Sequence, residues 1–243
     1  MNNFLNLLAG EIQRMKKYNV LAASVVVSFF WIGLIHLMEI PDITPLFTMI
    51  IFFDLVSMSI VMVGVTIFFE KQEGVLKSLF VSPISKAEFI SAKTIGTLFS
   101  NFITILIVYL YAIIFKEINI NILGLIGAAL LIGFFHTFLG ILIAYKCKDF
   151  TELLIGMMKY FFIFMIPVAL EQFSLITNQI YSYILYILPT KSSVTLMEAV
   201  GGNVDIELWE IILSTVYLSI GIVILAYFSF KKFKDFAIRE SGA

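Results

Sequence analysis

The chain has 243 residues, of which 60% are hydrophobic and only 14% are charged, whereas charged residues make up about 25% of an ordinary soluble domain. A water-soluble fold could not bury that much apolar surface, and a net charge of −1 argues against binding to nucleic acid. The composition therefore predicts an integral membrane protein.

Residues 1–17 predict an amphipathic helix that lies along the membrane surface. One face of this helix is apolar and the polar side chains lie largely elsewhere. The apolar face consists of Phe4, Leu5, Leu8, Ile12 and Met15. The segment has neither the order of basic and apolar residues nor the cleavage site of a signal peptide. A frayed polar tail is the alternative.

Six later stretches meet or approach the roughly 20 apolar residues that a bilayer span requires. They are Val20–Met38, Leu46–Phe69, Ile95–Phe115, Ile122–Tyr145, Tyr160–Ile176 and Leu208–Phe230. All should be helices, because lipid offers no partners for unpaired backbone groups. The fifth stretch is the shortest and contains Pro167. The chain is therefore expected to be all-α, with six transmembrane helices in a single membrane domain over residues 1–243.

Basic residues orient these spans, because loops rich in Lys and Arg stay in the cytoplasm. With six spans, both termini lie on one side of the membrane. Of the 16 Lys and Arg residues, only Lys116 and Lys191 fall on the other side. Both termini are therefore predicted to be cytoplasmic, in the plasma membrane of a bacterial cell.

The connection after the second span, residues 70–94, is then the longest cytoplasmic segment. A short helix is expected there, with an apolar face formed by Val75, Leu76, Leu79 and Phe80. Pro83 ends it, and Ser85 with Glu88 forms a capping box for the next helix. A short helix with an exposed apolar face suits docking onto another protein. An ordinary amphipathic loop that stabilises the bundle is the alternative.

Three polar side chains interrupt the apolar stretches. Asp54 in the second span is expected to face the bundle interior or a water-filled cavity, either as a substrate-pathway residue that favours cations or as a hydrogen-bonded carboxyl. Glu171 either lines an outer vestibule or lies at the outer interface in water. His136 is expected to bond a neighbouring helix, beside a small-residue face that favours close packing. That face consists of Gly133, Thr137, Gly140 and Ala144.

The outer segment, residues 177–207, precedes the last span. Its apolar run Tyr181–Leu188 is too short to cross a bilayer, and Pro189 and the Gly201–Gly202 pair interrupt the path. The pattern predicts short interfacial helices.

The stretch "EKQEGVLKSLFVSPISKAEFISAK" resembles the segment that follows the second span in ABC-2 type transporter permeases. The matching positions are Glu70, Lys71, Glu73, Gly74, Val75, Leu76, Leu79, Phe80, Ser82, Pro83, Ile84, Ser85 and Lys93. The span count, the surface helix and the long outer segment extend the resemblance over the chain. The stretch "LPTKSSVTLMEA" is similar to fluoroquinolone-export permeases, although small permeases for peptide antibiotics and lantibiotic immunity look broadly alike.

The resemblance implies that residues 70–94 contain a coupling helix that sits in a groove of a separate ATPase subunit. Its contacts with that subunit correspond to Glu73, Gly74, Val75, Leu76, Leu79 and Phe80, and Pro83 and Ser85 would fix its angle to the third span. The resemblance also implies that residues 177–207 form re-entrant helices and an external gate. Two permease copies, or this chain and a similar permease, would pair near the first and fifth spans.

The expected function is the permease subunit of an ATP-driven exporter for an amphipathic or hydrophobic compound. The chain lacks the glycine-rich phosphate loop of an ATPase, so no catalytic role, metal or cofactor is expected of it, and ATP and Mg²⁺ would bind two partner subunits. Candidate wall residues of the pathway are Phe52, Phe53, Met58 and Met62. The alternatives are an ATP-independent transporter or channel that uses Asp54, an intramembrane enzyme and a membrane scaffold.

Overall fold

The computed structural model describes residues 3–75, 84–202 and 205–241, and almost all of its regular structure is helical. The elements are α1 Asn3–Lys17, α2 Val20–Leu37, α3 Thr44–Gln72, α5 Lys86–Phe115, α6 Ile122–Lys146, α7 Phe150–Tyr160, the π-helical turn η1 Phe161–Met165, α8 Ile166–Gln172, α9 Gln179–Leu185, α10 Pro189–Val200 and α11 Leu208–Ser241. One isolated β-bridge joins Asp42 and Glu117. The all-α prediction is confirmed.

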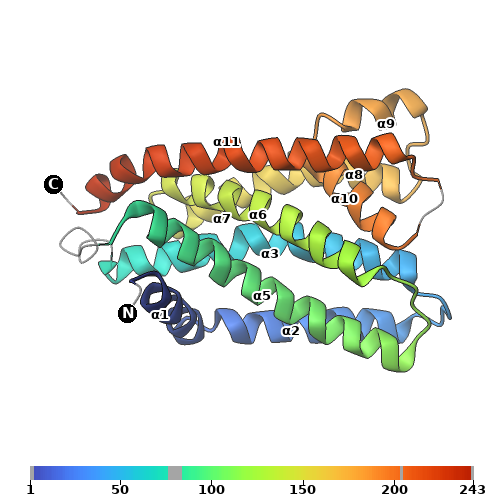
Figure 1. Ribbon diagram of the computed structural model, residues 1–243, viewed down its shortest axis with the longest axis horizontal. Helices are drawn as coiled ribbons and strands as arrows, with labels where there is room; N and C mark the ends of the chain where they lie inside the picture. Colours follow the sequence, from blue (N-terminus) through green and yellow to red (C-terminus); the bar gives the residue numbers. More distant parts are fainter. Residues whose placement is uncertain (1–2, 76–83, 203–204, 242–243) are drawn as a thin grey trace.

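Six helical segments are long and apolar enough to cross a membrane. They are α2, α3, α5, α6, the continuous segment Phe150–Gln172 and the first part of α11. Figure 1 shows them running side by side along the long axis, with α1 and the end of α11 at the same end of the bundle. We call this the terminal end and the opposite one the distal end. The six-span architecture predicted from hydropathy is confirmed.

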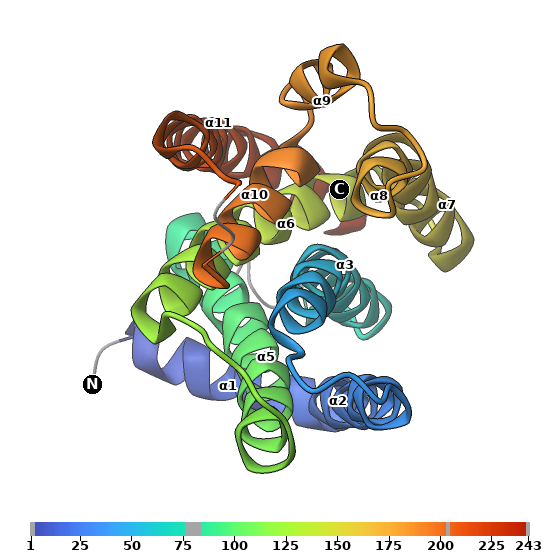
Figure 2. The same cartoon turned by 90° about the vertical axis from the view of Figure 1, so that its right-hand side faces the viewer.

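Helices α3 and α6 form the centre of the bundle. Seen from the distal end, α2 and α5 lie on one side of α3 and α7 with α8 on another, while α11 covers α6 (Figure 2). At Gly140 of α6, an added Cβ would lie 2.9 Å from Cα of Ile60 in α3, so only glycine permits this approach. The small-residue face predicted on the fourth span packs closely, as expected.

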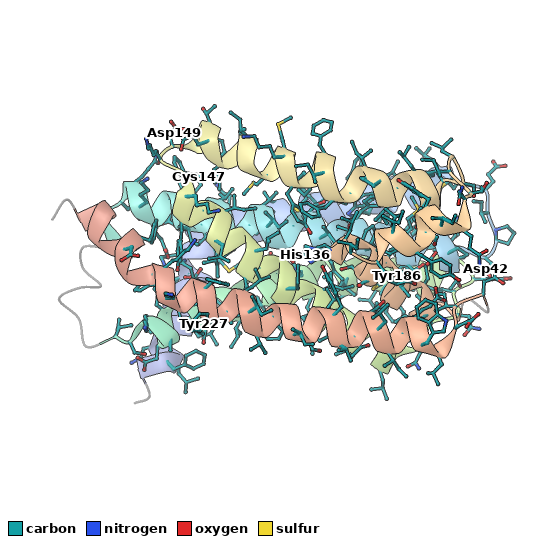
Figure 3. All side chains as sticks on the ribbon, turned by 90° about the horizontal axis from the view of Figure 1, so that it is seen from above. Asp42, His136, Cys147, Asp149, Tyr186 and Tyr227 are labelled. Atoms are coloured by element: carbon teal, nitrogen blue, oxygen red, sulfur yellow. The ribbon has the colours of Figure 1, made fainter. Side chains whose placement is uncertain are left out.

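The buried histidine of α6 bonds a neighbouring helix, as predicted. His136 lies midway along the bundle (Figure 3), with Nδ1 2.8 Å from the carbonyl oxygen of Ile132 and Nε2 3.0 Å from the hydroxyl oxygen of Tyr160 in α7. Because a carbonyl oxygen only accepts, Nδ1 carries the hydrogen and Nε2 accepts from Tyr160. This bond ties α7 to α6.

The fifth span differs from its predicted bounds of Tyr160–Ile176. It begins at Phe150, after an Asp149 side chain that accepts a hydrogen bond from the backbone of Glu152, and it ends at Gln172. The hydropathy reading began too late because Glu152 and Lys159 interrupt the apolar run. It also ended too late, because Ser174 has a φ of 55°, which a continuing helix does not adopt.

A π-helical turn lies inside this span, directly before Pro167. Proline lacks the backbone N–H that would bond the carbonyl of Ile163, and its ring crowds that carbonyl. Ile163 lies within the π-helical turn Phe161–Met165. In such a turn a carbonyl pairs with the N–H five residues later instead of four, so the Ile163 carbonyl does not depend on the N–H that Pro167 lacks. The proline is therefore accommodated without ending the helix.

Residues 177–207 contain α9 and α10, joined where Pro189 starts α10. Helix α10 packs against α3, α6 and α11, and most of its side chains are buried. Gly202 after its end has a φ of 70°, a conformation that favours glycine. Short helices were predicted here, and their depth in the bilayer stays a prediction.

Candidate functional site

Four charged side chains meet inside the terminal end of the bundle. Arg14 of α1 lies 2.7 Å from Oε2 of Glu11 and 2.7 Å from Oε1 of Glu70 in α3. Lys93 of α5 lies 2.7 Å from Oε2 of Glu70 and 3.1 Å from Oε1 of Glu11. We call these four residues the ion cluster. It joins three helices through two acids and two bases.

The ion cluster is buried because α1 turns a carboxylate toward the bundle. Glu11 shares a helical face with Leu8 and Met15, and both Glu11 and Met15 are buried. On α5, Gly96 makes room for the approach, since a Cβ there would lie 2.9 Å from Cγ of Glu11. The predicted surface helix thus packs against α5 and carries an ionic contact at the edge of its apolar face.

Burial and charge act in opposite directions within the ion cluster. Burial favours a raised pKa for Glu11, but the charges of Lys93 and Arg14 outweigh it and lower that pKa below its ordinary value. Burial likewise opposes the charge of Arg14, whereas Glu70 and Glu11 raise its pKa. The side chain of Lys93 is only 1% exposed and that of Glu70 is fully buried. Loss of any one member would leave an uncompensated buried charge.

A second contact links the end of α1 to the beginning of the connection after α3. Lys17 Nζ lies 2.6 Å from Oε1 of Glu73, and the hydroxyl of Tyr18 donates to Oε2 of Glu73 at 2.9 Å. The hydrogen bond from Lys17 and then that from Tyr18 hold the pKa of Glu73 below its ordinary value. Gly74 follows with a φ of 68°. The chain therefore leaves the direction of α3 directly after Glu73, the residue that Lys17 and Tyr18 contact.

The structure describes only some of the predicted coupling residues. Glu73, Gly74 and Val75 are described, whereas Leu76, Leu79, Phe80 and Pro83 lie outside the described residues. On the far side of this connection the predicted capping box is confirmed. Ser85 Oγ accepts from the backbone of Glu88, and the Glu88 carboxylate accepts from the backbone of Ser85. Helix α5 therefore begins at Lys86, directly after the predicted cap, and continues into the third span.

The carboxylate of the second span lies inside the bundle. Asp54 is fully buried, and its Oδ1 accepts a hydrogen bond from Trp31 Nε1 of α2 at 3.0 Å. The interior placement was predicted, but the indole partner was not. The role of Asp54 in a substrate pathway stays a prediction.

The four candidate wall residues separate into two places. Phe52 is buried and its ring centroid lies 5.1 Å from that of Phe53. Met62 packs in a small cluster with Met15, together with the half-buried Met58. This cluster also contains Val20 of α2, and the proposed wall role stays a prediction for all four.

At the distal end, Glu171 of α8 pairs with Lys191 of α10. Lys191 Nζ lies 2.8 Å from both carboxylate oxygens and 5.4 Å from the ring centroid of Tyr186. The Tyr186 hydroxyl donates to Glu210 of α11 at 2.7 Å. Glu171 also lines a cavity of about 290 Å³ with these residues, and its role in an outer vestibule stays a prediction.

Sequence reasoning missed Glu11 and Lys191 as parts of these networks. A signal for Glu11 was present, because it occupies the apolar face of α1. Lys191 was visible as one of two basic residues at the distal end among many acids. Within the described ranges no group of three His, Cys, Asp or Glu residues is placed to hold a metal ion.

Comparison with known proteins adds one finding. A family model described as "ABC-2 family transporter protein" matches residues 11–231, a range that starts at the first residue of the ion cluster and contains five of the six candidate spans and nearly all of the sixth. Among curated proteins, none matches the sequence.

Proposed function

Because this chain belongs to the ABC-2 transporter family, we propose that it is the permease subunit of an ATP-driven exporter for an amphipathic or hydrophobic compound. In this proposal the terminal end faces the cytoplasm of a bacterial cell. Two copies of a separate ATPase subunit bind ATP and Mg²⁺ there, and two permeases pair around the pathway. The observation that carries the proposal is the ion cluster at the terminal end.

The ion cluster links the helices on both sides of the predicted docking segment, residues 73–85. Residues 73–85 connect α3 to α5, and the cluster joins the last turns of α3 to the first turns of α5 through Glu70 and Lys93. Arg14 adds α1 to the same joint. A displacement of the docking segment by an ATPase therefore moves three helices together instead of bending one loop.

The uncovered faces of the single chain support pairing with a second permease. Helix α2 exposes large apolar side chains along its length, and the fifth span does so as well. These faces include Val26, Phe29 and Phe30 on one helix and Phe162, Ile163 and Ile166 on the other. Helix α11 is also widely exposed, which leaves it for contact with lipid or with the same partner.

The docking role is tested by co-purification of the ATPase with a tagged chain. Leu79→Asp combined with Phe80→Asp places charge on the predicted apolar face, so the ATPase should be lost while the permease still purifies as a folded protein. The matched control is Phe173→Asp with Leu175→Asp, two exposed distal residues, which should retain the ATPase. Normal ATPase recovery with the first variant would refute docking through this segment.

The role of the ion cluster in transmitting movement is tested by measuring ATPase binding and transport separately. Arg14→Lys keeps the charge but not the planar group that reaches Glu11 and Glu70 together. We expect the ATPase to stay bound and to hydrolyse ATP while transport in proteoliposomes falls severalfold. Lys16→Gln, an exposed neighbour on α1, should leave transport unchanged. Normal transport by Arg14→Lys would show that the ion cluster only stabilises the fold.

A further inference from the structure

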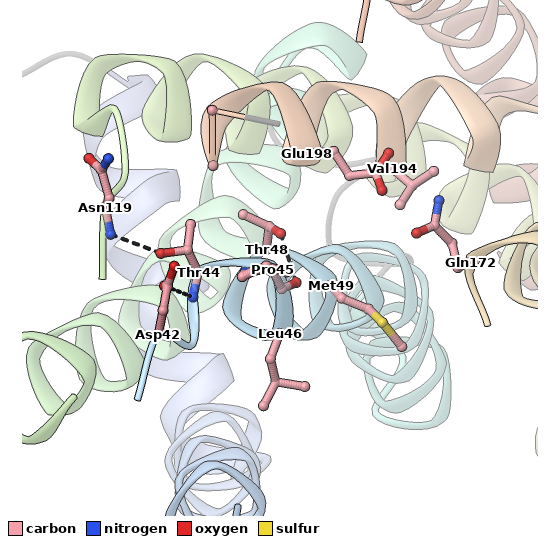
Figure 4. Close-up of a pocket in the computed structure, with 12 residues that line it drawn as sticks. Asp42, Thr44, Pro45, Leu46, Thr48, Met49, Asn119, Gln172, Val194 and Glu198 are labelled. Atoms are coloured by element: carbon pink, nitrogen blue, oxygen red, sulfur yellow. Dashed lines mark hydrogen bonds between the residues drawn. The ribbon is translucent and has the colours of Figure 1, made fainter. Parts of the chain in front are cut away.

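A cavity of about 560 Å³ opens at the distal end between α3, α8 and α10. We call it the distal hollow, and its lining includes Thr44, Thr48, Met49, Gln172, Val194 and Glu198. Figure 4 shows Glu198 and Val194 reaching in from α10, opposite the start of α3. This volume lies within the range of about 300–1,000 Å³ that small-molecule sites occupy.

The hollow is bounded by a close contact between α10 and α3. At Gly201, an added Cβ would lie 3.0 Å from Cγ2 of Thr48 and 3.1 Å from Cγ2 of Thr44. The two helices thus touch at one edge of the space. The hollow is therefore framed by packed helices.

Most polar groups on its α3 side are already bonded within the protein. The Thr44 hydroxyl oxygen accepts from the backbone N–H of Asn119, and the Thr48 hydroxyl donates to the carbonyl of Pro45. Asp42 at the mouth accepts from the backbone of Thr44. These bonds leave Met49, Leu46 and Val194 as apolar wall on either side of the space.

Glu198 brings a negative charge into this wall that is not matched there. None of the described residues that line the hollow is basic. The nearby cation, Lys191, makes two 2.8 Å contacts to Glu171. Burial raises the pKa of Glu198, and the charge of Lys191 and a hydrogen bond from Gln172 offset this only in part. A positive ligand would relieve the cost of keeping this carboxylate ionised.

We propose that the distal hollow binds a lipophilic cation, with the positive group paired to Glu198 and the apolar body packed against Met49, Leu46 and Val194. Binding requires only this chain. That such a cation is exported cargo is a further step, and that step rests on the proposed function. The hollow assigns the substrate class by charge as well as by hydrophobicity.

The test uses the purified full chain in nanodiscs of uncharged phosphatidylcholine, without any ATPase. Radiolabelled tetraphenylphosphonium is the probe, and tetraphenylborate is an anion of the same shape. We expect saturable binding of the cation and no competition by the anion. Glu198→Gln keeps the shape of the side chain and removes its charge, so the dissociation constant should rise about tenfold.

Two further variants complete the test. Glu39→Gln removes an exposed distal carboxylate outside the hollow, and it should change the dissociation constant less than about twofold. Met49→Trp fills the hollow while keeping Glu198, and it should also weaken binding. Equal binding by wild type and Glu198→Gln, absence of saturable binding, or competition by tetraphenylborate would each overturn the proposal. Failure of ATPase docking would leave these results unaffected.

Discussion

The two ends of the bundle both bury ion pairs, but they balance charge differently. At the terminal end, Glu11 and Glu70 face Arg14 and Lys93, so two acids meet two bases in a joint among three helices. At the distal end, Lys191 pairs with Glu171, and Glu198 remains in the wall of a hollow. A filled, neutral joint suits the transmission of movement, whereas a hollow with surplus negative charge suits a ligand.

Removal of a basic side chain from the ion cluster should have the largest effect on the free energy of unfolding. Lys93→Met leaves Glu11 and Glu70 buried with Arg14 as their remaining cation, so the free energy of unfolding should fall by about 3–5 kcal/mol. Thermal unfolding of the detergent-purified protein measures this. Lys86→Met is the matched control, because Lys86 is exposed on the same helix. Similar melting curves for both variants would mean that the joint contributes little to the fold.

The corresponding change at the distal end should cost less. Lys191 and Glu171 retain 9% and 15% side-chain exposure, so water can solvate a charge that loses its partner. Lys191→Met should lower the free energy of unfolding by about 1.5–3 kcal/mol, as measured in the same assay. Adding Glu171→Gln should restore part of the loss. If Lys191→Met proved as damaging as Lys93→Met, the contrast between the ends would not hold.

Asp54 lies between the two ends and should separate stability from transport. In Asp54→Asn the amide oxygen still accepts from Trp31, so the free energy of unfolding should change by no more than about 1 kcal/mol. If the carboxylate belongs to the pathway, transport by the assembled complex should nevertheless fall severalfold. Transport assays with a fully assembled complex give the answer, and a normal rate would remove Asp54 from the pathway.

The exposed contact at Glu73 should have the smallest effect, and it should depend on pH. The pKa of Glu73 is lowered in the fold, so its pairing with Lys17 contributes stability above the ordinary carboxyl pKa and loses it as pH falls through the lowered value. The melting temperatures of wild type and Glu73→Gln should therefore differ near pH 7 and converge in acid.

Lys17→Gln should show the same dependence as Glu73→Gln, because both remove one pair. A difference that persisted at low pH, or that appeared in only one of the two variants, would assign the stability to another contact of Glu73, such as its bond from Tyr18.

The sequence was sufficient for features that depend on neighbours in the chain. Hydropathy located the six spans, and the Ser85–Glu88 spacing predicted a cap that the structure confirms. It was insufficient where the partner is remote, as with the pairing of Glu11 and Lys93 across 82 positions. Lys93 was placed in the connection after the second span without a partner, and in the structure it is neutralised within α5 by carboxylates from two other helices.

The same distinction explains the outcome for the pathway residues. Asp54 was recognised by its depth in an apolar stretch, but its Trp31 partner depends on how α2 packs against α3. The residues near Asp54 in the sequence do not determine how these two helices pack. The distal hollow was invisible for the same reason, since its walls come from α3, α8 and α10 and only the fold brings them together.

The π-helical turn in the fifth span also sets a phase relation along that helix. Each residue of an α-helix advances the side-chain direction by about 100°, and a π-helical turn behaves as one extra residue in the winding. Deletion of one residue from Phe161–Met165 would rewind the turn as ordinary α-helix and leave the direction of everything beyond it nearly unchanged, whereas rewinding without a deletion would rotate the distal half by about 100°. Without the π-helical turn and with no residue removed, Glu171 would face away from Lys191, so the turn keeps the distal half of this span in the direction that its ion pair requires.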